Sequence, residues 1–410
     1  MSSGKEPQVV FLCERVTHYR TAFFARTADR LAKQGIRFTV TAAVPTRAST
    51  VRNDLADPQD LEWLTLKRTW RLNFGRRRLV WHRAFRHLLD AELLVAEQGS
   101  RLLSVYPAIP LKSHVGPKVA LWGHGINRDR DAASRVGEAM KQRVASQADW
   151  WFCYTEGTAS IVSDLGVDRD RITVVQNAVD TSGIRAARDN LTPDDIAAVR
   201  RELGLGDGPV ALWLSSIYDR KRPEFMVSAA DAIRADIADF ELLVVGDGPQ
   251  RHIFDEAAET RPWLHVLGAR NGLDAVPPAG TASILVNPGL VGLTVLDGFA
   301  LGLPMITCDL PYHSPEIEYL QHDLNGLLLP RHATSGDFAE ACVRLLTDRQ
   351  ELGRLSDAAR QASFQYTLEE MVERFTSGIL QALESERPRS VRRKLRNPFS
   401  RTEPPDGEQV

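Results

Sequence analysis

Short apolar runs alternate with longer amphipathic patterns along this chain, and that alternation constrains the fold more than any other feature. Apolar runs that alternate with helices are typical of parallel α/β units. Expected strands of a first set lie at residues 8–13, 36–44, 92–96, 119–122, 150–154 and 172–175. Those of a second set lie at residues 210–214, 241–245, 264–267, 283–287, 305–308 and 326–329. The sequence therefore predicts an α/β protein with two Rossmann-like domains.

The length of 410 residues also favours more than one domain. We expect a first domain over residues 1–190, a linker over 191–208 and a second domain over 209–366. A helix at 367–386 is expected to pack back on the first domain. The tail at 387–410 is rich in Arg, Pro, Ser and Glu, and we expect it to be disordered. Ligands of such proteins bind beyond the carboxyl ends of the strands, and with two such domains we expect the site in the cleft between them.

Composition and charge exclude several classes of protein. The formal net charge of -2 argues against a general nucleic-acid binder. The chain has no run of about eighteen apolar residues, so we expect no membrane-spanning helix. Its apolar start is short and is expected to be a strand instead of a secretion signal. The four cysteines are far apart and form no CxxC pair, which disfavours a disulfide or a zinc site and favours the cytoplasm.

The most informative stretch covers residues 284–309, ILVNPGLVGLTVLDGFALGLPMITCD. An apolar strand ends there, a glycine-containing loop follows, and a helix then runs into Gly-Leu-Pro. The loop places the backbone amides of Gly292, Leu293 and Thr294 at a helix N-terminus, where free amides bind anions such as phosphates. Asp297 lies one turn further along the helix, and its carboxylate could accept the two hydroxyls of a ribose.

This stretch resembles the donor-site signature of family 4 of the retaining glycosyltransferases, which have the GT-B fold. In that family, two glutamates separated by seven residues flank a glycine-rich turn, and a helix ending in Gly-x-Pro follows. Asp297 matches the second glutamate, which binds ribose, and Gly292 matches the glycine that faces the diphosphate. Gly289 stands in place of the first glutamate, which the family uses against the sugar ring. The PGLVGLT loop is similar to a branch of the family that would contact the sugar through backbone amides.

The segment LWLSSIYDRKRPEF at residues 212–225 resembles the family loop that supplies an arginine and a lysine to the diphosphate. Lys221 matches the lysine, whereas Ser216 stands at the arginine position, so Arg220 or Arg222 could substitute for it. A cation bound to phosphate forms a strong, charge-assisted hydrogen bond. The alternative is a solvated basic turn.

Two later segments complete the expected donor side. VLGARNGLD at residues 266–274 resembles the segment that meets the nucleotide base, and it is either a donor contact or a structural turn. In the segment at 313–330, Glu316 is either a site residue or a helix cap. The full set of expected donor contacts is Ser216, Arg220, Lys221, Gly268, Arg270, Gly289, Val291, Gly292, Leu293, Thr294 and Asp297.

Fewer residues mark the acceptor side, in the first domain. His124 directly follows an expected strand in a glycine-flanked turn, and it resembles the family's sugar-contacting histidine. We therefore expect His124 and Lys221 to be the catalytic pair. Glu97 and Arg101 of the EQGSR segment, together with Arg20, are candidates for acceptor binding or for structural roles. The NAVD segment at 177–180 is interpreted as an interdomain turn.

Two D-x-D triplets, at residues 129–131 and 168–170, could in principle hold a divalent cation on a diphosphate. Both lie in charged turns that are typical of helix starts, so we expect no metal site. No cofactor is expected, and the nucleotide diphosphate sugar is a co-substrate.

Residues 67–87 carry eight basic and several aromatic side chains, and they have no acidic residue between Glu62 and Asp90. We expect a basic helix that contacts an anionic membrane surface, with the arginine-rich tail as a second weak contact. The alternative is an ordinary solvated helix, and nucleic-acid binding is disfavoured.

The expected function is retaining transfer of a sugar from a nucleotide diphosphate sugar to a hydroxyl of a lipid-linked or saccharide acceptor. The resemblance implies cell-surface polysaccharide or glycolipid synthesis, by a protein in the cytoplasm or at the inner face of the membrane. Two rivals remain open. One is a nucleotide-sugar epimerase, which would need an acid/base carboxylate near the sugar. The other is a non-catalytic nucleotide-sugar-binding protein, favoured by the missing glutamate and arginine.

Overall fold

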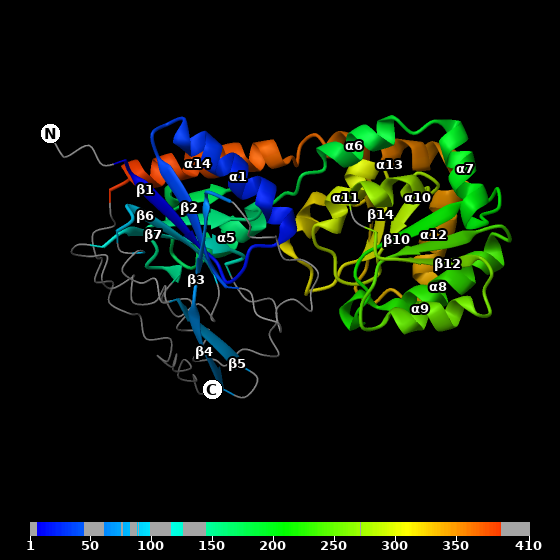
Figure 1. Ribbon diagram of the computed structural model, residues 1–410. Coiled ribbons are helices and arrows are strands. Elements are labelled where there is room, and N and C mark those ends of the chain that lie inside the picture. Colours follow the sequence, from blue (N-terminus) through cyan, green and yellow to red (C-terminus); the bar gives the residue numbers. More distant parts are fainter. Residues whose placement is uncertain are drawn as a thin grey trace, which may run out of the picture.

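The computed structural model describes residues 6–44, 61–74, 77–82, 88, 90–98, 116–125, 145–270 and 272–386. It contains one seven-stranded and one six-stranded sheet, both parallel, which lie side by side with helices on both faces of each (Figure 1). The prediction of an α/β protein with two Rossmann-like sheets is confirmed.

The first sheet has the strand order β3-β2-β1-β6-β7-β8-β9. Its strands are β1 (Gln8–Leu12), β2 (Arg37–Ala43), β3 (Leu64–Lys67), β6 (Leu93–Glu97), β7 (Lys118–Gly123), β8 (Trp150–Cys153) and β9 (Ile172–Val174). Helices α1 (His18–Ala32) and α14 (Leu368–Glu384) cover one face, and α5 (Glu156–Asp164) covers the other. Phe375 of α14 packs at the centre of an aromatic core with Phe11, Phe23, Trp122 and Phe152.

The second sheet has the order β12-β11-β10-β13-β14-β15. Its strands are β10 (Val210–Leu214), β11 (Glu241–Val245), β12 (Leu264–Gly268), β13 (Ile284–Val286), β14 (Met305–Cys308) and β15 (Gly326–Leu329). One face is covered by α8 (Pro223–Asp236), α9 (Arg251–Ala258) and α12 (Ser335–Thr347). The other is covered by α6 (Ser182–Asp189), α7 (Pro193–Leu203), α10 (Val276–Ala279), α11 (Thr294–Leu301) and α13 (Arg349–Ala362).

Each sheet has one point at which the strand order reverses, between β1 and β6 in the first sheet and between β10 and β13 in the second. Ligands of open α/β sheets bind just beyond the carboxyl ends of the strands at this point. The loops that follow β10 and β13 contain Lys221 and the glycine-rich segment, respectively. The topology therefore brings the predicted donor residues to one edge of the second sheet.

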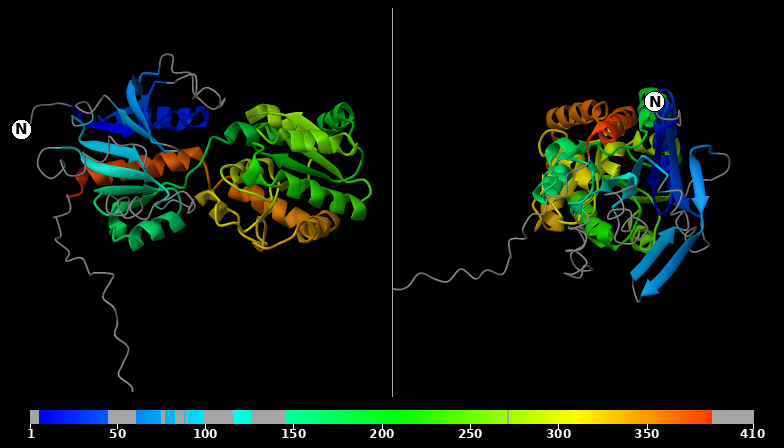
Figure 2. Two further views of the ribbon diagram at one scale, coloured as in Figure 1. Left: turned by 90° about the horizontal axis from the view of Figure 1, so that it is seen from below. Right: turned by 90° about the vertical axis from the view of Figure 1, so that its left-hand side faces the viewer.

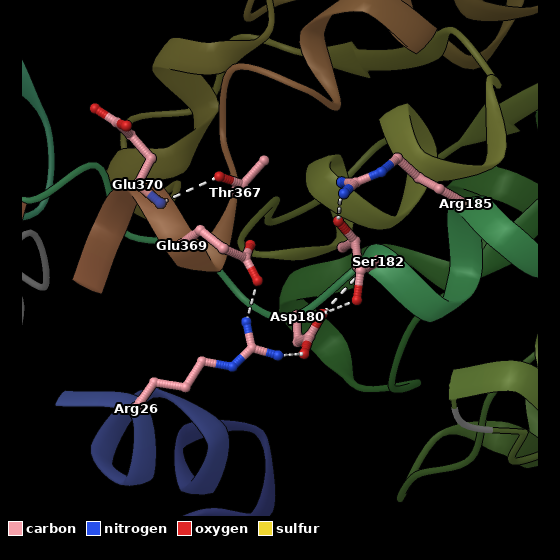
Figure 3. A network of polar contacts seen from close by, with 8 residues as sticks. Arg26, Asp180, Ser182, Arg185, Thr367, Glu369 and Glu370 are labelled. Atoms are coloured by element: carbon pink, nitrogen blue, oxygen red, sulfur yellow. Dashed lines mark hydrogen bonds and ion pairs between the residues drawn. The ribbon is translucent and has the colours of Figure 1, made fainter. Parts of the chain in front are cut away.

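The chain crosses between the sheets twice, and both crossings lie against α1. In Figure 3, Arg26 of α1 forms ion pairs with Asp180, where the chain leaves the first sheet, and with Glu369, where it returns. Arg30 pairs with Glu373 one turn further along α14. Figures 1 and 2 show α14 running beside α1 over the first sheet. The last helix therefore completes the core of the first sheet.

The helix expected within residues 67–87 is wrong for the part of this stretch that the structure describes. β4 (Thr69–Phe74) and β5 (Arg77–His82) form an antiparallel hairpin, in which Trp70 lies opposite Trp81 and Leu72 opposite Leu79. Polar and apolar residues alternate along β4, which is the period of a strand and not of a helix. Trp70 is 61% exposed.

None of the helices in the described part of the chain has the length and apolar character that crossing a bilayer requires. The expected disordered tail at 387–410 and the triplet at 129–131 lie outside the described residues. The second triplet lies at the start of a short 3-10 turn, Arg169–Arg171. Within the described ranges, no three side chains suited to a metal ion come together.

Candidate donor and acceptor sites

The loop after β13 is folded by hydrogen bonds that use some of its amides and leave others available. Gly289 N donates to Asn287 Oδ1 (3.3 Å), and Leu290 N donates to the Arg220 carbonyl (2.8 Å). Val291 N donates to His313 Nδ1 (2.9 Å). The next three amides, at residues 292–294, have no acceptor among the described residues, and α11 begins at Thr294. These amides lie at the positive end of the helix dipole, where the sequence predicts an anion site.

Gly289 lies directly against the backbone of the neighbouring loop. A Cβ atom added to Gly289 would lie 2.4 Å from the Arg220 carbonyl oxygen and 2.4 Å from Lys221 Cα. Real Cβ atoms do not approach backbone atoms this closely, so a side chain cannot be placed here without moving one of the loops. The absence of the first glutamate therefore follows from the way in which these two loops pack together.

Lys221 ends a 3-10 turn, Asp219–Lys221, and its side chain runs into the protein. The residue is only 5% exposed, and its Nζ donates to the Leu290 carbonyl (2.5 Å) in the donor loop. Burial lowers the pKa of the Lys221 ammonium to about 7. No carboxylate offsets this desolvation among the described residues. A diphosphate beside Nζ would supply the missing negative charge.

The two arginines that could replace the arginine of the family differ in their contacts and in their exposure. Arg222 has a left-handed backbone (φ 62°), and its guanidinium lies 3.9 Å from the centre of the Phe225 ring and donates to the Pro288 carbonyl (3.4 Å). Its side chain therefore helps to pack the two loops together. Arg220 is half-exposed, over the ring of Tyr312 at 4.8 Å, and Ser216 is exposed. Arg220 is the better candidate for a second phosphate contact.

Asp297 lies in the first turn of α11 and is half-buried. Burial raises the pKa of its carboxyl group to about 7. No hydrogen bond to this carboxyl group is formed within the described part of the chain. Two ribose hydroxyls would satisfy both of its oxygens.

The other predicted donor residues lie beyond the neighbouring strands. Gly268 ends β12 with φ 72°, and its carbonyl accepts a hydrogen bond from Gly246 N (2.9 Å) after β11. A Cβ at Gly246 would lie 1.9 Å from the Ser215 carbonyl, so this turn is packed against the loop that carries Ser216. Arg270 follows at the half-exposed edge. The three loops after β12, β11 and β10 therefore form one continuous edge.

The acceptor-side candidates gather at the carboxyl ends of the first sheet. His124 directly follows β7, is exposed, and places its ring edge-on to Tyr154 at 4.6 Å. The Arg20 guanidinium lies 5.9 Å from the Tyr154 ring and 5.8 Å from the Trp122 ring, within reach of cation–π attraction. Glu97 ends β6, and its pKa is raised to about 7, mainly by burial, with Arg20 acting in the opposite direction. Arg101 lies outside the described residues.

Sequence reasoning missed two residues that hold these loops in place. Gln98 Nε2 donates to the Gly125 carbonyl and Gln98 Oε1 accepts from Gly125 N, both at 2.7 Å, so it clamps the turn of His124. His313 is buried, accepts from Val291 N through Nδ1 and bonds the Cys308 carbonyl through Nε2 (2.7 Å). Both residues lie in segments that resemble the family, but no spacing of residues in the sequence marks either hydrogen-bond pattern.

Sequence models of two families match consecutive parts of the chain. The model of Glycosyltransferase Family 4 matches residues 22–182, and that of Glycosyl transferases group 1 matches residues 208–348. Together the two matches include most of the chain, and they include β10, β13 and both donor loops.

Curated relatives are similar over parts of their length. The chain is 27% identical over 180 residues to a D-inositol 3-phosphate glycosyltransferase of Geodermatophilus obscurus, covering 42% of this chain and 34% of that protein. It is 25% identical over 292 residues to an alpha-D-kanosaminyltransferase of Streptomyces kanamyceticus, covering 66% of each. It is 36% identical over 196 residues to a GDP-mannose-dependent alpha-(1-6)-phosphatidylinositol monomannoside mannosyltransferase of Mycolicibacterium smegmatis, covering 44% of this chain and 45% of the relative. The matched part is thus less than two thirds of each relative.

Solved structures agree over nearly the whole chain. A glycosyltransferase from Rickettsia africae has a TM-score of 0.67 at 12% identity, covering 93% of this chain and 100% of that chain. Anabaena HepE in complex with UDP has a TM-score of 0.67 at 13% identity, covering 91% and 99%. At such identities the likeness concerns the fold alone. From the two family matches and this fold, the chain belongs to the family 4 and group 1 glycosyltransferases with the GT-B fold.

Proposed function

We propose that this chain is a retaining glycosyltransferase that moves a sugar from a nucleotide diphosphate sugar to an acceptor hydroxyl. One observation carries the proposal. At the switch point of the second sheet, the unbonded amides of residues 292–294, the buried ammonium of Lys221 and the carboxyl group of Asp297 belong to loops in direct contact. This combination suits a diphosphate joined to a ribose.

The proposed chemistry is electrostatic. As the bond to the sugar breaks, negative charge develops on the leaving diphosphate, and Lys221 and the loop amides stabilise it. A phosphate oxygen of the leaving group then takes the proton of the acceptor hydroxyl on the same face of the sugar. Retention and metal independence are inferred from the family resemblance. His124 contacts the sugar, and Arg20 and Glu97 bind the acceptor.

We propose a lipid-linked or saccharide acceptor and a cytoplasmic protein that binds the inner face of the membrane. The relatives include proteins named for phosphatidylinositol mannoside and inositol phosphate acceptors. The hairpin β4–β5 supports a lipid contact, because Trp70 is largely exposed and Arg68 beside it is exposed. Tryptophan and basic residues together favour an anionic lipid surface.

The test is a panel of nucleoside diphosphates (UDP, GDP, ADP, CDP and dTDP) added singly to the purified protein during thermal unfolding. A ligand at a hundred times its Kd stabilises the folded state by about 2.7 kcal/mol, so one member should raise the melting temperature clearly. No shift with any of the five would refute the donor site. A shift without turnover of the matching nucleotide sugars would instead favour a non-catalytic binding protein.

Asp297→Asn should lose most of the nucleotide-induced shift but gain stability in the absence of ligand. Because burial raises the pKa of Asp297 to about 7, the folded state binds a proton that the unfolded state releases near pH 4. The cost of the charged carboxylate is therefore absent at low pH, grows between pH 4 and 7, and is complete above pH 7. The variant should be more stable than wild type at pH 8 by on the order of 1–3 kcal/mol, with a smaller gain at pH 5.

Denaturant unfolding at pH 5, 7 and 8 measures this difference. The matched control is Asp309→Asn, an exposed carboxylate at the end of β14. The control should change neither the stability nor the nucleotide shift. A variant of Asp297 that is less stable than wild type at pH 8 would contradict the burial argument.

His124→Ala should lower kcat/KM by about 10- to 100-fold, the loss expected for one hydrogen bond worth 1.5–3 kcal/mol. Because His124 is exposed, the melting temperature should change little. Initial rates with the donor found in the panel measure the effect. His252→Ala, an exposed histidine of α9, is the control. Equal activity of the two variants would remove His124 from the site.

A further inference from the structure

The 3-10 turn Pro315–Tyr319 lies between the donor loop and the first sheet. The two residues before it are bonded to both main-chain groups of one residue of the donor loop, Val291. Val291 N donates to His313 Nδ1, and Ser314 N donates to the Val291 carbonyl, both at 2.9 Å. Val291 precedes the unbonded amides, so the position of the donor loop and that of this turn are fixed together.

The same turn also reaches the acceptor side, through Glu316. Glu316 and Asn177 are each 2% exposed, and the Asn177 side-chain amide donates to Glu316 Oε1. Asn177 Oδ1 in turn accepts from the Arg20 guanidinium (2.5 Å). Tyr319 OH donates to the Asn177 carbonyl (3.2 Å). A buried carboxylate therefore fixes the orientation of Asn177, and Asn177 fixes Arg20.

A second carboxylate of the turn caps a helix of the first sheet. Glu318 Oε1 accepts from the Thr155 hydroxyl and Oε2 accepts from Gly157 N, both at 2.9 Å. A negative charge at this end of α5 is favoured by the free amides and the helix dipole. Gly157 permits the contact, because a Cβ there would lie 2.3 Å from Glu318 Oε1.

We propose that Glu316 and Glu318 are positioning residues, which hold the acceptor side in register with the donor loop. The proposal rests on the proposed function, because it assigns the Gly292–Thr294 amides to a diphosphate. A diphosphate on these amides fixes Val291, and Val291 fixes the turn through His313 and Ser314. The turn then holds Arg20 through Asn177 and the start of α5 through Glu318. Donor binding is thereby coupled to the arrangement of the acceptor side, without direct contact between the two substrates.

Hydrogen exchange of the full-length protein, read by mass spectrometry on a peptide covering the start of α5, tests this coupling. In the ligand-free protein, Glu318→Ala should exchange at least fivefold faster than wild type at this peptide, because Gly157 N loses its acceptor. The nucleoside diphosphate selected by the panel should slow exchange further in wild type. It should have no such effect in Glu318→Ala, whereas Glu318→Gln, which keeps an oxygen for Gly157 N, should restore it. Glu316→Ala should instead remove the slowing at a peptide that covers Asn177, whose side chain it releases.

Glu351→Ala is the matched control, because it breaks an ion pair with Arg354 that lies entirely within the helices of the second sheet. It should match wild type in every comparison. Unchanged exchange in Glu318→Ala would overturn the proposal, and so would a bound diphosphate that slows exchange at the start of α5 equally in wild type and Glu318→Ala. If no diphosphate raises the melting temperature, the proposed function fails. The ligand-free comparison of wild type with Glu318→Ala then still decides whether the turn holds α5.

Discussion

Replacing Gly289 by glutamate, which would restore the sequence pattern of the family, is expected to abolish donor binding instead of improving it. A Cβ at this position would lie 2.4 Å from backbone atoms of Arg220 and Lys221, so the two loops must separate to admit any side chain. Separation breaks the bond from Leu290 N to the Arg220 carbonyl and that from Lys221 Nζ to the Leu290 carbonyl. We expect a loss of about 1–3 kcal/mol of stability from overpacking, and more than ~100-fold in donor affinity.

Calorimetric titration with the diphosphate found in the panel, and thermal unfolding, measure both effects. Gly289→Ala separates the effect of the added volume from that of the added charge, and it should show most of the damage. The control is Gly353→Ala in α13, where an added Cβ meets no atom within 4 Å. This control should be neutral or slightly stabilising, since alanine favours helices. A Gly289→Glu variant with tighter donor binding would mean that the loops do not pack as described.

Lys221→Met is expected to lower kcat/KM by about 10²- to 10³-fold, the usual effect of removing one donor that stabilises a developing anion. Lys221→Arg should retain more activity because its charge is permanent. The pH dependence of donor affinity is a second signature. Since burial holds the pKa of Lys221 near 7, the free protein must take up a proton to bind a diphosphate at higher pH. Wild-type affinity should fall up to about tenfold per pH unit above 7, and Lys221→Arg should not show this slope.

Titrations at pH 6, 7, 8 and 9 would establish the slope, and Lys33→Met, an exposed lysine after α1, is the control. The Lys221→Met variant should lose activity but gain stability against unfolding at low pH. The folded state binds fewer protons than the unfolded state between pH 7 and 10.5, so the cost of the buried ammonium is complete below about pH 7 and disappears as the pH rises. Lys221→Met should therefore be more stable than wild type at pH 6. A flat affinity profile in wild type would show that the ammonium is not desolvated.

The order of helices and strands was predictable, because the spacing of apolar residues and the positions of turn residues determine secondary structure locally. The strands at residues 210–214, 241–245 and 305–308 were expected with the bounds that the structure has. The many arginines of residues 67–87 favour a basic helix, whereas the structure has the hairpin β4–β5. The alternation of Trp70, Leu72 and Phe74 indicates the strand β4.

Only those parts of the site that belong to a short, continuous sequence motif were predictable. The Gly292–Thr294 amides follow from a glycine-rich loop before a helix, a local pattern. The reason for Gly289 is not local, because it depends on a turn almost seventy residues earlier in the chain. From the sequence, Glu316 is either a site residue or a helix cap. In the structure it bonds Asn177, whereas Glu318 caps a helix of the other sheet. Contacts between distant loops leave no spacing that a single sequence reveals.

The two crossings at Asp180 and Glu369 both pair with Arg26. They make the half with the proposed donor site, the donor half, an insertion within the half with the proposed acceptor side, the acceptor half. Both ends of the inserted segment meet the same helix, so the acceptor half keeps α14 and its aromatic core whatever is inserted. A donor half from a relative could therefore be exchanged as one cassette with two junctions. A chimera cut once, after the first crossing, would instead exchange α14 as well and lose the Phe375 contacts of its host. Evolution of donor specificity in this architecture is thus a matter of replacing an insert, with the acceptor half retained as its frame.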